Sequence, residues 1–221
     1  MQQVAEYRQA NQALVLLAQR DLADFWASLN ISRDPFLVRD ELLLFLPDLV
    51  QTYGDTAAVL AADWYDSLRD APVSASSFAA VLASPPRAGQ VVGSAKWAVG
   101  PLFQDDPDAA LRLLSGATQR LVLKSGRDSF DVSARRDPLR TSWARIPSGA
   151  TTCRWCVMLA SRGAVYANAA KAGEMNEFHD NCDCVQVPIR SDSDWPDGHD
   201  LSYFERLYVE QSGIGRDVPV F

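Results

Sequence analysis

The feature that most constrains this chain is the position of its four cysteines, which all lie in one short window in the C-terminal third. With one histidine they form the pattern C-x2-C, then 22 residues, then H-x2-C-x-C. The members are Cys153, Cys156, His179, Cys182 and Cys184. Thiolates and imidazoles are the ligands of tetrahedral zinc, and a C-x2-C turn places two sulfurs on one side of the ion. The pattern predicts a structural zinc ion, with five candidate ligands for four positions.

The choice among the five ligands stays open. The four cysteines are the simplest set, but we expect Cys182 and Cys184 to alternate along a strand and so to point to opposite faces. This alternation favours Cys153, Cys156 and His179 with one of Cys182 or Cys184, unless the segment bends. Two further residues, Arg162 and Asp183, are expected to orient the ligands from outside the metal shell. Buried thiols, or thiols partly joined in disulfides, are the alternative to a metal.

The compartment bears on that alternative. The N-terminal stretch MQQVAEYRQANQ is polar and lacks the layout of a signal peptide. The chain contains no apolar run of about 18 residues, so we expect no membrane span. A reducing cytosol is therefore the expected site of folding, and clustered cysteines there more often bind metal than form disulfides.

The N-terminal part, residues 1–124, is dominated by a helical period. Its first stretch carries an apolar stripe at spacings of mostly three and four. The stripe comprises Val4, Tyr7, Leu14, Ala18, Leu22, Phe25, Trp26 and Leu29. In the following helix, we expect Pro47 to cause a kink or a break and Gly54 to end it. A weaker helix is expected around Phe78, Val81 and Leu82.

Beyond residue 124 the pattern changes twice. Residues 125–150 read as a polar, basic linker, and residues 151–221 as a small metal-binding α+β domain with a strand in CVQVPIR and a helix in LSYFERLYVEQSG. The chain carries a formal net charge of −7, yet residues 120–145 hold seven basic and three acidic side chains. Arg135, Arg136 and Arg140 are therefore candidates for contact with packaged DNA. The alternative interpretation is that these arginines belong to a solvated connector and contact no DNA.

Enzymatic interpretations have weaker support in the sequence. The only histidines are His179 and His199, so a nucleophile such as Ser148 or Ser161 has few general bases available. No nucleophile-elbow pattern surrounds either serine. A nuclease centred on His179-Asp180-Asn181 would need further ligands around an open metal. The sequence shows no phosphate-binding glycine loop, and we favour a protein without catalytic residues.

Two runs carry a family resemblance. The run WARIPSGATTCRWCVMLASRGAVY at 143–166 and the later run FHDNCDCVQVP at 178–188 resemble the MuF-like minor capsid proteins of tailed phages, in the branch that infects actinobacteria. In that family the two Cys/His halves frame a small C-terminal domain behind a helical region. The resemblance implies a head-morphogenesis protein inside the capsid near the portal.

The expected fold is therefore mainly α-helical, with a small zinc-stapled α+β domain at its C-terminal end. The expected function is that of a structural minor capsid protein, made in the host cytoplasm and carried in the virion, which also assists DNA packaging or ejection. The resemblance implies the portal, the major capsid protein or the scaffolding protein as partners. The alternative is a capsid maturation protease, a label that some family members carry, or a zinc-stapled nuclease.

Overall fold

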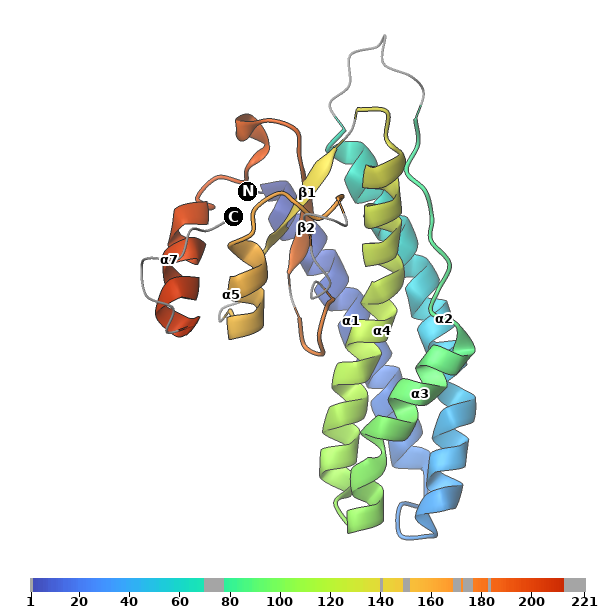
Figure 1. Cartoon of the computed structure of the whole chain (residues 1–221). Helices are drawn as coiled ribbons and strands as arrows, with labels where there is room; N and C mark the ends of the chain where they lie inside the picture. The colour runs from blue at the N-terminus through green and yellow to red at the C-terminus, as the bar shows by residue number, and fades with distance from the viewer. Residues whose placement is uncertain are drawn as a thin grey trace.

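A computed structural model describes residues 2–69, 78–139, 141–148, 152–168, 172, 177–182 and 184–212. It is mainly helical with a small two-stranded sheet near the C-terminal end, so the predicted fold class is confirmed. The elongated part is a bundle of three long helices and a shorter one, with the sheet and two further helices beside its upper end (Figure 1). The bundle helices are α1 (Gln2–Ser28), α2 (Pro35–Ser67), α3 (Ala88–Ala98) and α4 (Pro107–Arg136).

Local signals set where two of these helices begin. The Asp34 side chain accepts a hydrogen bond from the Phe36 backbone N–H at 2.9 Å, with Pro35 in the first turn of α2. Asp106 caps α4 in the same way, accepting from the backbone N–H of Ala109 at 2.9 Å. A 3-10 turn, η1 (Gly100–Gln104), connects α3 to α4.

The main core of the bundle lies between α1, α2, α3 and α4. Leu22 of α1, Leu42 of α2 and Leu114 of α4 are each at most 1% exposed within it. The apolar stripe on α1 therefore faces the main core at Leu22. None of the helices in the described ranges is both long and apolar enough to cross a membrane.

The predicted end of a helix at Gly54 is wrong, because α2 runs without interruption through both Pro47 and Gly54. Leu46 and Val50, on either side of Pro47, are buried in the main core, and this packing outweighs the local cost of the proline. Gly54 is buried where α2 meets α4, and a Cβ there would lie 2.7 Å from the Ser125 hydroxyl oxygen. This glycine permits close approach of two helices and does not stop one.

The first half of the expected basic linker is helical in the structure. Residues 125–136 continue α4, and the strand β1 (Ser142–Ile146) follows shortly after. The helical period is hard to see because Phe130 is the one large apolar side chain on the buried face of α4 here, and the rest of that face consists of small residues and an arginine. Gly126 lies so close to α2 that a Cβ would be 2.7 Å from the Ala57 carbonyl oxygen.

The helix expected around Phe78, Val81 and Leu82 is absent from residues 78–87, which form an extended segment along α4. Serine side chains of α4 hold this segment. The hydroxyl of Ser133 accepts from the Val81 backbone N–H at 2.8 Å, and that of Ser129 accepts from the Ala83 N–H at 2.9 Å. Each hydroxyl donates its own proton to the carbonyl four residues earlier in α4, at 2.7 Å. These bonds satisfy the backbone N–H groups of Val81 and Ala83 without a helix.

The sheet consists of β1 and β2 (Val185–Ile189), which pair antiparallel with Ala144 opposite Val187. The helix α5 (Arg154–Ala160) lies between β1 and α7 (Leu201–Ser212) and contacts both (Figure 1). A short 3-10 turn, η2 (Asp192–Asp194), follows β2. The predicted strand in CVQVPIR and the predicted C-terminal helix are confirmed.

A second core joins the sheet to the upper end of the bundle. It is rich in aromatic side chains from α2, α4, β1 and the stretch after α5: Trp64, Tyr65, Phe130, Trp143 and Tyr166. The Trp64 indole N–H also donates to the Gln186 carbonyl oxygen in β2 at 3.0 Å. Residues from both sides of the expected linker therefore share one core, and the division into domains at 1–124 and 151–221 stays a prediction.

Candidate metal centre

The first pair of candidate ligands lies at the N-terminal end of α5. Cys153 is the N-cap residue of this helix, and its sulfur accepts the backbone N–H of Cys156 at 3.3 Å. This cap turns both thiols to the same side of the helix, as a C-x2-C turn requires for a shared ion. Cys153 is exposed and Cys156 is buried.

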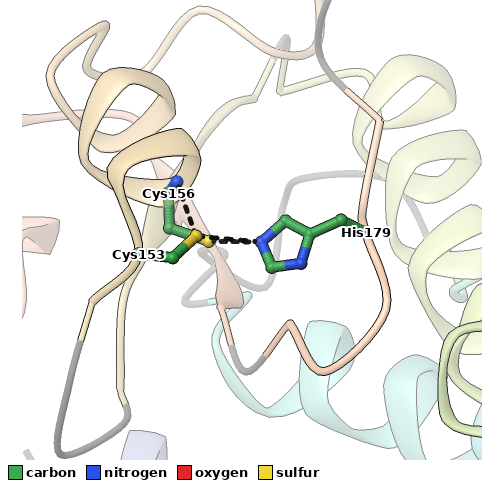
Figure 2. A group of neighbouring side chains, drawn as sticks. All are labelled: Cys153, Cys156 and His179. Carbon is green, nitrogen blue, oxygen red and sulfur yellow. Dashed lines mark hydrogen bonds between the residues drawn. The ribbon is translucent and has the colours of Figure 1, made fainter. Parts of the chain in front are cut away.

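His179 points from a loop toward both of these thiols (Figure 2). Its Nε2 lies 3.1 Å from the Cys153 sulfur and 3.2 Å from the Cys156 sulfur. The other ring nitrogen, Nδ1, donates to the Asp180 carbonyl oxygen at 2.6 Å, which leaves Nε2 with its lone pair toward the thiols. Metal-binding histidines are commonly oriented by such a bond from the far nitrogen.

The second pair, Cys182 and Cys184, lies directly before β2 and is buried. The Cys156 and Cys182 sulfurs are 3.6 Å apart, and the sulfurs of Cys156, Cys182 and Cys184 all lie within 4.8 Å of one another. The expectation that Cys182 and Cys184 would face opposite ways is wrong, because side chains two positions apart along an extended chain point to the same side. Asn181, at φ +59°, adopts the left-handed conformation in the turn that leads into them.

The five predicted ligands thus form two overlapping groups that share Cys156. Cys153, Cys156 and His179 make one group, and Cys156, Cys182 and Cys184 make the other. Around a tetrahedral zinc, sulfurs would be about 3.8 Å apart, and a sulfur and a nitrogen about 3.5 Å apart. The observed separations of 3.1, 3.2 and 3.6 Å are near these values, so the donor set fits a zinc ion in both chemistry and spacing.

Crowding of the thiols separates their acidities. A hydrogen bond to Cys182, together with burial, raises the pKa of Cys156. Hydrogen bonds from Cys156 and Cys184, with the nearby Arg127 guanidinium, lower the pKa of Cys182. The Arg127 guanidinium thus favours the thiolate form of Cys182, the form that binds metal.

The orienting role expected of Arg162 and Asp183 stays a prediction. The Arg162 guanidinium donates to the Ala172 carbonyl oxygen at 2.7 Å and holds the chain after α5, whereas Asp183 lies outside the described residues. The structure brings an unforeseen ion pair to the site instead. Arg120 of α4 contacts the Asp180 carboxylate at 2.6 Å, next to His179. No motif in the sequence connects these two residues.

The basic side chains of residues 120–145 do not form one exposed surface. Arg136 is exposed, Arg135 pairs with Asp131 at 2.8 Å one helical turn away, and Arg140 lies outside the described residues. Two other arginines of the window, Arg127 and Arg145, are buried.

The residues considered for catalysis lie in separate settings. His199 stacks on Trp195 and Phe204, with ring centroids 5.0 and 5.2 Å away, and burial lowers its pKa. The Ser161 hydroxyl donates to the Met158 carbonyl oxygen at 2.8 Å at the end of α5. Aromatic packing accounts for the position of His199, and the hydrogen bond at the end of α5 accounts for that of the Ser161 hydroxyl.

Similarity to known proteins identifies the family of this chain. A family model described as "VG15 protein" matches residues 1–211. The Gene 15 protein of Mycobacterium phage D29 is 29% identical, over 70% of this chain and 68% of its own length. The Gene 15 protein of Mycobacterium phage L5 is 27% identical, over 97% of this chain and 87% of its own length. No solved structure matches the chain. Because the family model covers nearly the whole sequence and these relatives are encoded by phages, the chain belongs to the VG15 protein family, a family of phage proteins.

Proposed function

We propose that this phage protein is a structural minor capsid protein that acts in head morphogenesis near the portal. The observation that carries the proposal is the convergence of Cys153, Cys156, His179, Cys182 and Cys184, the residues on which the resemblance to MuF-like proteins depends. Its membership in a phage protein family agrees with this role. The protein would be made in the host cytoplasm and packaged inside the virion.

The metal centre in this proposal is structural. Cys153 and Cys156 belong to the start of α5, whereas Cys182 and Cys184 precede β2, so one ion would tie the helix to the sheet. Zinc bound by four protein ligands supplies folding free energy and leaves no open position for a substrate or water. Histidine and cysteine side chains with buried thiols suit such a closed shell.

The proposed partners are the portal, the major capsid protein or the scaffolding protein, with packaged DNA as a further partner. For DNA, Arg135 and Arg136 are both exposed, and Arg135 would exchange its bond to Asp131 for a phosphate. Replacing both by glutamine should weaken binding and lower the dependence on salt concentration by up to about two released counterions. Filter binding at several salt concentrations measures this. Wild-type protein that does not bind at low salt would remove DNA from the proposal.

Analysis of particles tests the main role. Mass spectrometry of purified virions and of proheads should find the intact chain in both, at a copy number far below that of the major capsid protein. A phage lacking the gene should assemble defective heads, and a wild-type copy supplied in trans should restore them. Presence in proheads followed by loss from mature virions, with cleavage of capsid protein that depends on this chain, would support the protease alternative instead.

A further inference from the structure

Two arginines from different elements bury their charged ends beside the thiols. Arg127 comes from α4 and is 8% exposed, and Arg145 comes from β1 and is 0% exposed. A buried guanidinium gives up its hydration, which costs several kcal/mol unless an opposite charge or a set of hydrogen bonds offsets the loss. The position of both side chains therefore requires an explanation.

The ring of Phe178, next to His179 in sequence, lies between the two guanidinium groups. The central carbon of Arg127 is 3.9 Å from the ring centroid and that of Arg145 is 3.6 Å from it. Two guanidiniums on one face at these distances would overlap, so they cover opposite faces of the ring. This arrangement fixes the segment that carries His179 and Cys182.

Both arginines also bond directly to the ligand segment. Arg127 donates to the Cys182 carbonyl oxygen at 2.8 Å. Arg145 donates to the Glu177 carbonyl oxygen at 3.3 Å and toward the Cys182 sulfur at 3.9 Å. One candidate ligand thus receives a bond from Arg127 on its backbone and from Arg145 on its sulfur.

The charge on Arg127 is not matched by a carboxylate. Among the described residues, none of its nitrogens lies within 4.0 Å of an acidic side chain, and its buried Nη1 atom makes no hydrogen bond. Burial lowers the pKa of Arg127, and the neighbouring thiols of Cys182 and Cys184 act in the opposite direction. The negative charge available to this guanidinium is that of the thiolates.

We propose that Arg127 and Arg145 are the counter-cations of a thiolate-bound divalent metal, and that Arg145 also positions the Cys182 sulfur. The inference rests on the structural metal proposed above. A divalent ion with three thiolates and an imidazole carries a net charge of −1, and with four thiolates −2, so either shell is anionic. The arginines offset this buried charge, and the thiolates in turn stabilise the buried arginines. Metal affinity and the burial of these arginines are thereby linked.

The first test measures zinc affinity in the full chain by competition with a chromogenic chelator. Arg127→Met and Arg145→Met keep the apolar length and remove the charge, and each should weaken zinc binding about 10- to 100-fold. Arg136→Met, on the exposed face of α4, is the matched control and should bind as the wild type does. Unchanged affinity in both buried variants would overturn the inference. Failure of the wild-type protein to bind zinc would instead overturn the structural metal itself.

The second test separates a counter-cation from a residue that only packs. Thermal melting is followed with zinc and with chelator present. A packing role lowers the melting temperature by a similar amount in both conditions. A counter-cation lowers it with zinc only, since the metal-free protein has no anionic metal shell for the arginine to offset. Equal losses in both conditions would contradict the proposal.

A measurement on the wild type covers the case in which the methionine variants do not fold. The guanidinium hydrogens of Arg127 and Arg145, observed by nitrogen-15 NMR, should exchange faster with solvent after chelation. Those of the exposed Arg136 should not change. If chelation leaves the exchange of both buried arginines unaltered, metal and arginine burial are not linked and the inference is wrong.

Discussion

The contact between α2 and α4 makes a sharp prediction about Gly126→Ala. In an isolated helix this change is favourable by about 1 kcal/mol, because alanine has the higher helix propensity. In this protein the new Cβ would stand 2.7 Å from the Ala57 carbonyl oxygen, about 0.7 Å short of ordinary contact. The obstacle is backbone and cannot rotate away, so the two longest helices must separate.

Overpacking of this kind costs about 1–3 kcal/mol. After subtraction of the propensity gain, Gly126→Ala should change the free energy of unfolding by between about 0 and −2 kcal/mol. Gly93→Ala is the matched control, since Gly93 lies within α3 and a Cβ there meets nothing within 4 Å. It should show the propensity gain alone, about 1 kcal/mol of stabilisation.

Urea denaturation of both variants, followed by circular dichroism at fixed zinc concentration, measures the difference. The two identical substitutions should differ by about 1–3 kcal/mol, with Gly126→Ala the less stable. If Gly126→Ala is stabilised as much as Gly93→Ala, the close approach of α2 and α4 is not a constraint and the explanation given for both buried glycines fails.

Three further outcomes are expected. Leu22→Ala should cost about 2–5 kcal/mol as a cavity in the main core, whereas Leu44→Ala, at a residue 78% exposed, should leave the melting temperature nearly unchanged; an equal effect in both would contradict the assignment of the core. Chelation should expose residues 152–184 to limited proteolysis and leave a fragment containing the four bundle helices, and uniform protection would refute the metal staple. Burial opposes ionisation of Asp137, but hydrogen bonds from Arg69, the Leu139 N–H and Tyr65 outweigh it and hold the pKa of this carboxyl below its ordinary value. The resulting stabilisation should be complete above about pH 5 and decline as the pH falls through about 3.9 and below. In Asp137→Asn this acid-dependent part of the unfolding free energy should be missing, and an identical pH profile in both proteins would refute it.

The sequence was most informative where a signal is local. The spacing of Cys153, Cys156, His179, Cys182 and Cys184 identified the group of side chains that converges, because ligand spacing reflects a chemical requirement of the ion. The aspartate-proline pairs at the starts of α2 and α4 are also local signals. Each half of the ligand pattern, and each helix start, depends only on residues a few positions apart.

Signals that depend on a distant partner were misread. Gly54 resembles a helix end until α4 is placed against it. Residues 125–136 look like a linker because, apart from Phe130, their buried face is made of small residues and an arginine. Arg127 and Arg145 were counted as surface charge, since nothing nearby in sequence shows that thiols lie beside them. Composition predicts solvation for arginine, and only the tertiary arrangement reverses that expectation.

The spacing of Ser129 and Ser133 in α4 matches the spacing of backbone N–H groups in the extended segment beside them. Four residues of helix advance about 6 Å, and two residues of extended chain advance about 6.6 Å. The near equality lets Ser133 and Ser129 meet Val81 and Ala83 in antiparallel order. The next step would join Ser125 to residue 85, which is a proline and has no N–H to donate, and the Ser125 hydroxyl oxygen makes no hydrogen bond to the described residues. The advance of four helical residues and that of two extended residues therefore need to agree over only one step, from Ser133 to Ser129. The small difference between them does not add up over further steps. These two bonds fix the register of the segment, so we expect an insertion between residues 81 and 83 not to be tolerated.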